Sequence, residues 1–297
     1  MRHDDFRRAW GAFQGAQVSI RPVGGDVHHL RMRTLGSRAL GMDVSAYLVG
    51  DVLIDTGFAY VREPVMEALV DREISAIYCT HSHEDHTGNA AALSGVYGCP
   101  VYLRNSDQLW EEGVRTLAPY RRFWWGHIEP FCPLEMPEML ESGGRILRAV
   151  PAPGHSNTQV ALFEEATGDV FTGDLFVSPG ATAVLTWGDP WEEARSLRRV
   201  AALQPRRMLT GHGLIIDDPV PLLELKADRI EAAAQRAVQL AGEGIPPRTI
   251  VRRVFSRGRA KDRFFEFLTS RQFSRLNFVK SAVRFAPQPL RSPSLPQ

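Results

Sequence analysis

The chain has 297 residues, of which 44% are hydrophobic and 23% charged, and this balance excludes a wholly disordered protein. Its 35 Lys and Arg against 34 Asp and Glu give a net charge of +1, so the whole chain lacks the signature of a polyanion-binding protein. Three cysteines without paired spacing, no apolar run near the ~20 residues of a membrane helix, and no apolar stretch typical of a secretion signal lead us to expect a cytoplasmic protein without a membrane partner.

Short β-rich runs alternate with helical patterns over the first 225 residues. Each run is bounded by Gly, Asp, Pro or Asn, as strand ends usually are. The helical patterns begin at Pro64 and Pro190, and proline suits the first turn of a helix. The predicted strands are Val18–Val23, Ala46–Val49, Val52–Asp55, Ile74–Thr80, Val101–Arg104, Ile146–Pro151, Gln159–Phe163, Val170–Thr172 and Met208–Thr210.

The stretch Asn105–Ser142 is rich in aromatic residues and has no long periodic pattern. Two interpretations remain open for it. The segment could close one end of the core, or it could form a wall over a substrate cavity, since aromatic loops commonly shape ligand sites.

After residue 225 the pattern becomes helical and the charge changes. Residues 226–297 contain fifteen Lys or Arg and five Asp or Glu, a net charge of +10. We therefore predict a catalytic domain over 1–225, a basic helical region over 226–285 and a disordered tail over 286–297. The basic region could bind an anionic partner such as nucleic acid, or its arginines could simply balance the acidic remainder of the chain.

The segment Thr80–Gly88 carries the densest chemistry in the sequence. It places His81, His83, Asp85 and His86 within six residues, directly after an apolar predicted strand. Three imidazoles and a carboxylate cannot all be buried without partners, because each would lose several kcal/mol of solvation. The spacing predicts a metal-binding loop.

Three further candidate ligands follow predicted strands elsewhere in the chain. His155 and His212 are each flanked by glycine, and Asp174 follows the strand that ends near Thr172. Side chains at strand ends can be aimed at one point by a rigid sheet. We expect these residues to converge with the histidine segment.

The pieces Leu53-Ile-Asp55-Thr-Gly57, His81–His86, glycine-flanked His155, Gly173-Asp174 and Gly-His212-Gly resemble the metallo-β-lactamase superfamily of metallohydrolases and occur in its order. The resemblance implies an α/β fold, a four-layer αββα sandwich, here followed by a C-terminal helical extension. It also implies metal ions in a groove between the sheet edges.

The resemblance further implies a ligand set. One metal would be bound by His81, His83 and His155, and the second by Asp85, His86 and His212, with Asp174 bridging both. Imidazole and carboxylate donors suit two Zn²⁺ ions, although Mn²⁺ or Fe²⁺ would also be accepted. Asp55 could orient one ligand through a hydrogen bond, or it could serve only as a strand-end turn.

Two such metals can hold a hydroxide that attacks a carbonyl or phosphoryl centre. The candidate catalytic residues are Asp85 and Asp174, with Asp174 placed to shuttle a proton. A bridging carboxylate is absent from true β-lactamases of the superfamily, so the resemblance favours its glyoxalase II-like, lactonase-like or endoribonuclease-like branches.

We expect hydrolysis of a small carboxylic ester, thioester or lactone, because an aromatic lid suits burial of an acyl substrate. The alternative is an endoribonuclease or phosphodiesterase that uses the same site. A third reading is a metal-binding scaffold without turnover.

Overall fold

The computed structural model describes residues 10–11, 13–106, 119–142, 144–181, 183–255 and 266–288. Contacts divide the chain into two compact units. The first unit consists of Met1–Pro151, Asn157–Val177 and Pro205–Asp218, and the second of Ala152–Ser156, Ser178–Gln204 and Pro219–Gln297. The domain bounds drawn from the sequence stay a prediction, and residues 289–297 of the expected disordered tail lie outside the described residues.

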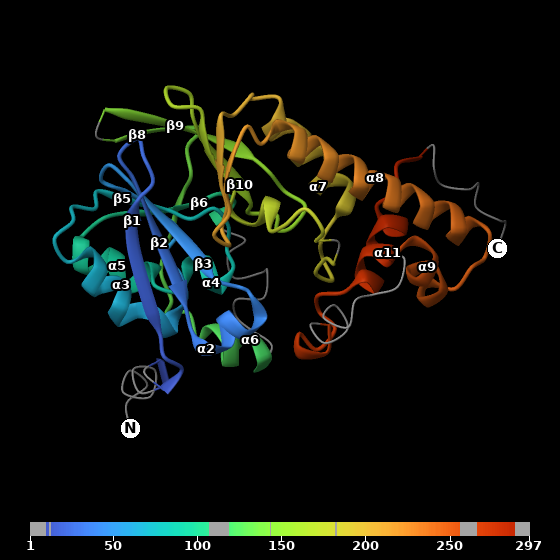
Figure 1. Ribbon diagram of the computed structural model, residues 1–297, viewed down its shortest axis with the longest axis horizontal. Helices are drawn as coiled ribbons and strands as arrows, with labels where there is room; N and C mark the ends of the chain where they lie inside the picture. Colours follow the sequence, from blue (N-terminus) through green and yellow to red (C-terminus); the bar gives the residue numbers. More distant parts are fainter. Residues whose placement is uncertain are drawn as a thin grey trace. The chain divides into compact units, whose positions relative to one another are not determined.

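The first unit contains a seven-stranded sheet whose strands follow chain order. The strands are antiparallel from β1 to β4 and parallel from β4 to β7. Figure 1 shows β1, β2 and β3 as long neighbouring strands at one side of this sheet. The strands are β1 (Gln17–Pro22), β2 (Val27–Arg33), β3 (Val44–Val49), β4 (Val52–Ile54), β5 (Ala76–Tyr78), β6 (Val101–Leu103) and β7 (Leu134–Glu135).

Strand β2 was not predicted from the sequence. Its run, Val-His-His-Leu-Arg-Met-Arg, does not show a clean alternation because two adjacent histidines interrupt the apolar positions. In the structure His29 is fully buried, lies 2.8 Å from the Ser45 hydroxyl through Nε2, and stacks on Tyr47. The hydrogen bond and ring contact from β3 thus allow His29, a polar residue, to occupy a core position.

A second sheet of six strands completes the first unit, with the order β13-β12-β11-β10-β9-β8. Its apolar side chains Val160, Leu162 and Phe171 form one buried cluster with Tyr47 and Ile54 of the first sheet. The two sheets therefore share an apolar layer. The strands are β8 (Met139–Ser142), β9 (Arg145–Pro151), β10 (Val160–Glu164), β11 (Asp169–Phe171), β12 (Arg207–Leu209) and β13 (Ile215–Asp217).

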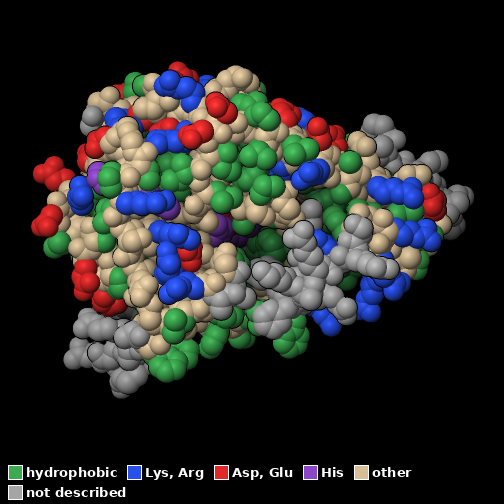
Figure 2. All heavy atoms as spheres, in the orientation of Figure 1, with side chains coloured by type: hydrophobic (Ala, Val, Ile, Leu, Met, Phe, Trp, Pro, Cys, Tyr) green, Lys and Arg blue, Asp and Glu red, His purple; other side chains and the backbone are tan. Residues whose placement is uncertain are grey.

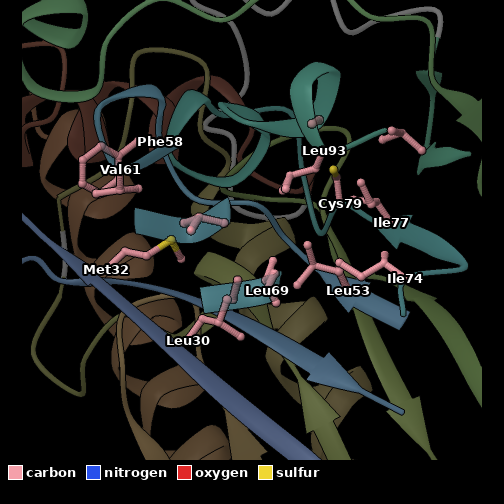
Figure 3. Packing of buried hydrophobic residues seen from close by; sticks show 14 of the residues in the cluster. Leu30, Met32, Leu53, Phe58, Val61, Leu69, Ile74, Ile77, Cys79 and Leu93 are labelled. Atoms are coloured by element: carbon pink, nitrogen blue, oxygen red, sulfur yellow. The ribbon is translucent and has the colours of Figure 1, made fainter. Parts of the chain in front are cut away.

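The other face of the first sheet is covered by helices α3 (Arg62–Leu69) and α5 (Ala90–Tyr97). Leu69 of α3 and Leu93 of α5 are fully buried in one cluster with the strand residues Leu53 and Ile77, as Figure 3 shows. Burial on both faces explains why β4 and β5 are continuous apolar runs. The predicted α/β sandwich is confirmed.

Four short helical segments that the structure describes lie in the connections of the first unit. They are α2 (Leu35–Leu40), η1 (Ala59–Val61), α4 (Glu84–Thr87) and η4 (Gly173–Phe176).

The described part of the aromatic stretch includes helix α6 (Pro119–Trp125). Trp125 meets the ring of Phe58 at 5.0 Å between centroids, and the Tyr60 hydroxyl donates to the Arg122 carbonyl at 2.8 Å. Trp125 thus packs against the buried cluster, which fits the interpretation that this segment closes the core. A wall over a substrate cavity stays a prediction, and Trp110 lies outside the described residues.

The second unit is helical, as predicted for the C-terminal extension. The side chain of Asp189 caps α7 by accepting from the Trp191 N–H at 2.9 Å, and the Trp191 indole donates to the Ala282 carbonyl at 2.9 Å. Arg198 binds Asp228 and Glu231, each at 2.7 Å. The helices are α7 (Pro190–Ala201), α8 (Val220–Gly242), α9 (Pro247–Val254) and α11 (Arg275–Arg284). Among the helices that the structure describes, none is both long and apolar enough to cross a bilayer.

Gly88 allows the histidine segment to approach the Phe58–Ala59 backbone, and a larger residue there is expected to destabilise the fold. A Cβ at this position would lie 2.6 Å from the Glu84 carbonyl oxygen and 2.7 Å from the Phe58 Cα. Because backbone atoms cannot move aside cheaply, Gly88→Ala should lower the free energy of unfolding by about 3 kcal/mol.

Gly95→Ala is the matched control in urea unfolding. Gly95 lies within α5, where a Cβ would meet nothing within 4 Å. Replacement of a helical glycine by alanine should raise stability by about 0.8 kcal/mol. Equal midpoints for the two variants would contradict the assigned packing of Gly88.

Candidate metal centre

Strand β5 delivers the histidine segment to the edge of the sheet, and contacts from the second sheet hold it there. The Val160 N–H of β10 donates to the Thr80 carbonyl at 2.8 Å, and the Thr158 hydroxyl accepts from the Ser82 N–H at 2.9 Å. The single-turn helix α4 then begins at Glu84. The segment is therefore a buried, hydrogen-bonded turn, and His81 and His86 have no exposed surface.

Asp55 follows β4 and fixes the orientation of His86. One carboxylate oxygen accepts from the Thr80 N–H at 2.7 Å, and the other accepts from the Thr80 hydroxyl at 2.9 Å and from Nδ1 of His86 at 2.7 Å. A carboxylate can only accept, so Nδ1 is the donor and Nε2 is left to face the other carboxylates. Asp55 also adopts φ +60° at the end of β4, as expected of a strand-end turn, while its action on a metal ligand stays a prediction.

His212 is oriented in the same way by a backbone carbonyl. Its Nδ1 lies 2.9 Å from the Asp43 carbonyl oxygen, an acceptor only, so this nitrogen is the donor. Nε2 then faces Asp174 Oδ1 at 3.2 Å and Asp85 Oδ2 at 3.9 Å. The preceding residue is Gly211, where a Cβ would lie 2.6 Å from the His86 ring, so only glycine lets the two histidines come this close.

His155 lies on the connection between β9 and β10. Helix α7 holds its neighbours: the Ser196 hydroxyl donates to the Pro153 carbonyl at 2.7 Å, and the Asp189 N–H donates to the Gly154 carbonyl at 2.9 Å. The position of His155 is thus fixed by backbone contacts on both preceding residues.

Six of the seven residues predicted from the sequence come together within the first unit, as two groups that share Asp174. Within each group the available ligand atoms lie within 4.8 Å of one another. The groups are His81, His83 and Asp174, and Asp85, His86, Asp174 and His212, while His155 belongs to the second unit. This is the grouping expected for two metal ions, while the role of each residue as a ligand stays a prediction.

The carboxylates and histidines of the second group shift each other's pKa. Burial lowers the pKa of His86 and His212, but the nearby carboxylates outweigh it, so the pKa of His86 is well above its usual range and that of His212 rises to about 9. Burial raises the pKa of Asp174, yet His212 and His86 hold it well below its usual range. Protons on the histidines balance the carboxylates, and a divalent ion would take their place.

A buried ion pair beside the centre was missed by the sequence analysis. Arg121 of α6 binds both carboxylate oxygens of Glu84 at 2.5 Å each, and both side chains are buried. Burial raises the pKa of Glu84, and the Arg121 charge opposes this. The pair ties α6 to the histidine segment next to Asp85. Nothing local in the sequence links the two residues, which lie 37 positions apart.

Asp55→Asn should weaken metal binding without unfolding the protein. Asparagine tolerates φ +60° and keeps one acceptor oxygen, but it removes the negative charge that strengthens His86 as a ligand. We expect one of the bound ions to be held about 10- to 100-fold more weakly. Competition with a chromophoric chelator measures the change.

The control for this experiment is Asp51→Asn. Asp51 lies directly before β4, whereas Asp55 lies directly after it, and the described hydrogen bonds of Asp51 come from Ser75 and Ser142. Its metal affinity should equal that of the unmodified protein. If Asp55→Asn also binds both ions normally, Asp55 does not act on the metal centre.

Comparison with known proteins agrees with this geometry. Residues 40–212 match the model of the Metallo-beta-lactamase superfamily. The chain is 27% identical over 247 residues to the Beta-lactamase-like protein 2 homolog of Drosophila melanogaster, covering 75% of this chain and 79% of that protein. It is 27% identical over 231 residues to the Atrochrysone carboxyl ACP thioesterase of Aspergillus fumigatus, covering 76% of this chain and 65% of that protein.

A Hydroxyacylglutathione hydrolase of Aeromonas hydrophila is 29% identical over 160 residues, and the match covers 51% of this chain and 52% of the hydrolase. Two solved structures are similar. A metallo-beta-lactamase family protein of Thermus thermophilus has a TM-score of 0.58 at 20% identity over 91% of each chain. TTHA1623 in a di-iron-bound form has a TM-score of 0.51 at 29% identity over 60% of this chain and 92% of its own. The family match covers more than half of the chain and includes the histidine and aspartate groups of the first unit. The relatives named above include hydrolases. The chain therefore belongs to the metallo-β-lactamase superfamily.

Proposed function

We propose that this protein is a dinuclear metal-dependent hydrolase of a small carboxylic thioester, with esters and lactones as related substrates. The observation that carries the proposal is the pair of ligand groups that meet at Asp174. A reducing, cytoplasmic setting belongs to the proposal, since Cys79, Cys99 and Cys132 are all free thiols.

The residues present fit two divalent ions. His81, His83 and His155 would hold one ion, Asp85, His86 and His212 the other, and Asp174 both. Nε2 of His86 supports this assignment, because it is buried, makes no hydrogen bond of good geometry within the described chain, and faces Asp174 at 3.3 Å and Asp85 at 3.7 Å. A buried polar atom of this kind needs a partner, and a metal ion that replaces its proton would be one.

Zinc is the ion we propose, because five imidazoles and two carboxylates are borderline donors that suit it. Manganese and iron accept the same donors, and TTHA1623, a similar structure, is described in a di-iron form.

When bound, two such ions would lower the pKa of a shared water and polarise the acyl oxygen of the substrate. The chain itself supplies the proton acceptor. We assign the proton transfer to Asp174, because its carboxylate lies between His86 and His212 and would lie beside the attacking water, where it could accept the proton that the water loses and return it to the leaving thiolate. Burial of His81, His83 and His86 keeps their rings in one orientation during this transfer.

The choice of a thioester is supported by two relatives. One is named a thioesterase of an acyl carrier and the other a hydrolase of hydroxyacylglutathione. These names describe those proteins, and the fungal thioesterase and the bacterial hydrolase are matched over only 65% and 52% of their lengths.

Single-stranded RNA is the second candidate substrate, because the second unit exposes basic side chains. Figure 2 shows blue Lys and Arg side chains gathered over α9 and α11. The exposed ones described include Arg236, Arg248, Arg252, Arg253, Lys280 and Arg284. They suit phosphates of a nucleic acid or an anionic group of a small substrate equally.

Freshly purified protein should contain about two equivalents of metal, mostly zinc, by elemental analysis. Asp85→Ala combined with His212→Ala removes two ligands of one group and should reduce the content to about one equivalent. A content of one that the double substitution leaves unchanged would contradict a dinuclear centre. Asp228→Ala combined with Glu231→Ala, which removes the partners of Arg198, serves as the control for a double substitution.

A substrate panel decides between the two candidate reactions. We expect turnover of a neutral acyl thioester that is lost in the Asp85→Ala, His212→Ala protein and changes little between low and physiological salt. RNA cleavage would fall steeply over the same range, because phosphate contacts release counterions. Metal-dependent, salt-sensitive cleavage of single-stranded RNA without thioester turnover would replace our proposal with the nuclease.

A further inference from the structure

Strand β3 offers free backbone groups near the metal centre because its neighbour β4 is short. The register pairs β4 with β3 only at Tyr47, Leu48 and Val49. The chain just before these residues, at Asp43 and Ser45, therefore extends past the end of β4. Backbone groups that are buried there need other partners.

The loop Thr210–Gly213, which carries His212, supplies those partners. The Ser45 N–H donates to the Gly211 carbonyl at 2.8 Å, and the Asp43 carbonyl accepts from Nδ1 of His212 at 2.9 Å. The Tyr47 hydroxyl donates to the Thr210 carbonyl at 2.7 Å. Residues 43 and 45 are alternate residues, so their backbone groups point to the same edge of the chain, while the Tyr47 side chain reaches the loop from one face of β3. Three successive residues of the loop are thus held by β3 and the residue just before it.

Each of the three holding groups is itself fixed. Asp43 binds Arg31 at 2.6 Å through its side chain. The Ser45 hydroxyl lies 2.8 Å from Nε2 of buried His29. Tyr47 is 2% exposed, stacks on His29 at 5.0 Å between centroids, and meets Phe171 of the second sheet at 5.3 Å. A side chain so enclosed cannot follow the loop if the loop moves.

We propose that Tyr47 is a positioning residue for the second metal: together with the backbone of Asp43 and Ser45 it holds the Thr210–Gly213 loop so that His212 presents Nε2 to the Asp85 and His86 group. Tyr47 does not touch the ion. Its hydroxyl restrains the residue two positions before the ligand, while His81, His83 and His155 lie on other loops. The inference rests on the proposed dinuclear centre and adds that the two ions depend on different parts of the scaffold.

Metal titration of the full-length Tyr47→Phe protein tests this inference. Apoprotein is titrated with Co²⁺ while its visible absorption is followed, and with Zn²⁺ against a chromophoric chelator. The first ion should bind as in the unmodified protein. The second should bind about tenfold more weakly, the loss typical of an outer partner of a ligand, and its cobalt absorption should change because the geometry at His212 relaxes.

Tyr97→Phe is the matched control. Its hydroxyl also donates to a backbone carbonyl, that of Leu69 at 2.6 Å, but on α5 and away from the ligand loops. If loss of one hydroxyl only weakens the fold, both variants should show the same small effect on both ions. Equal effects of the two variants, or unchanged second-ion binding in Tyr47→Phe, would overturn the inference.

Two further outcomes are distinguishable. If the unmodified protein binds a single ion, the proposed dinuclear centre fails and this inference fails with it. If Tyr47→Phe does not fold, as judged by circular dichroism, Arg31→Gln replaces it, because Arg31 is 45% exposed in its side chain and anchors Asp43. Weaker binding of the second ion with unchanged binding of the first then supports the positioning role, and unchanged binding of both ions overturns it.

Discussion

Asp174 is the side chain on which the two ligand groups depend. One of its oxygens, Oδ1, lies 3.3 Å from Nε2 of His86 and 3.2 Å from Nε2 of His212, and the residue also belongs to the group of His81 and His83. Burial of a carboxylate costs several kcal/mol unless positive charge lies close by. The histidines supply that charge as protons, and a metal ion would supply it more strongly. The surrounding structure keeps these groups close despite the cost.

Each histidine of the second group is held at the nitrogen that does not face the centre. Asp55 accepts from Nδ1 of His86, and the Asp43 carbonyl accepts from Nδ1 of His212. Because both acceptors lack protons, the tautomer and the ring orientation are set before any ion arrives. An ion bound there would meet a prepared site and would lose little affinity to reorganisation of its ligands.

The two sheets make this preparation possible. The first sheet is covered by helices on one face and by the second sheet on the other. Its strands are therefore buried on both faces and have little freedom to move. The ligand-bearing turns begin where these strands end, and contacts such as Thr80 with Val160 and Ser45 with Gly211 cross from one sheet to the other. Packing of the apolar layer therefore sets the distance between the ligands.

The sequence by itself predicted the fold class, which the structure confirms, and named the candidate ligands. His81, His83, Asp85 and His86 stand in one short segment after an apolar strand, and local spacing is sufficient to mark such a segment as a metal loop. His155, Asp174 and His212 were found because each follows a strand and the order matches a known superfamily. Only the tertiary structure decided the contacts between distant segments. Strand β2 was hidden because His29 is buried against Ser45 and Tyr47, and the Glu84–Arg121 pair and the hold of β3 on the His212 loop join residues that no local pattern connects. Hydrogen bonds of this kind arise when packing brings two strands or loops together, so periodicity and spacing along one segment cannot reveal them.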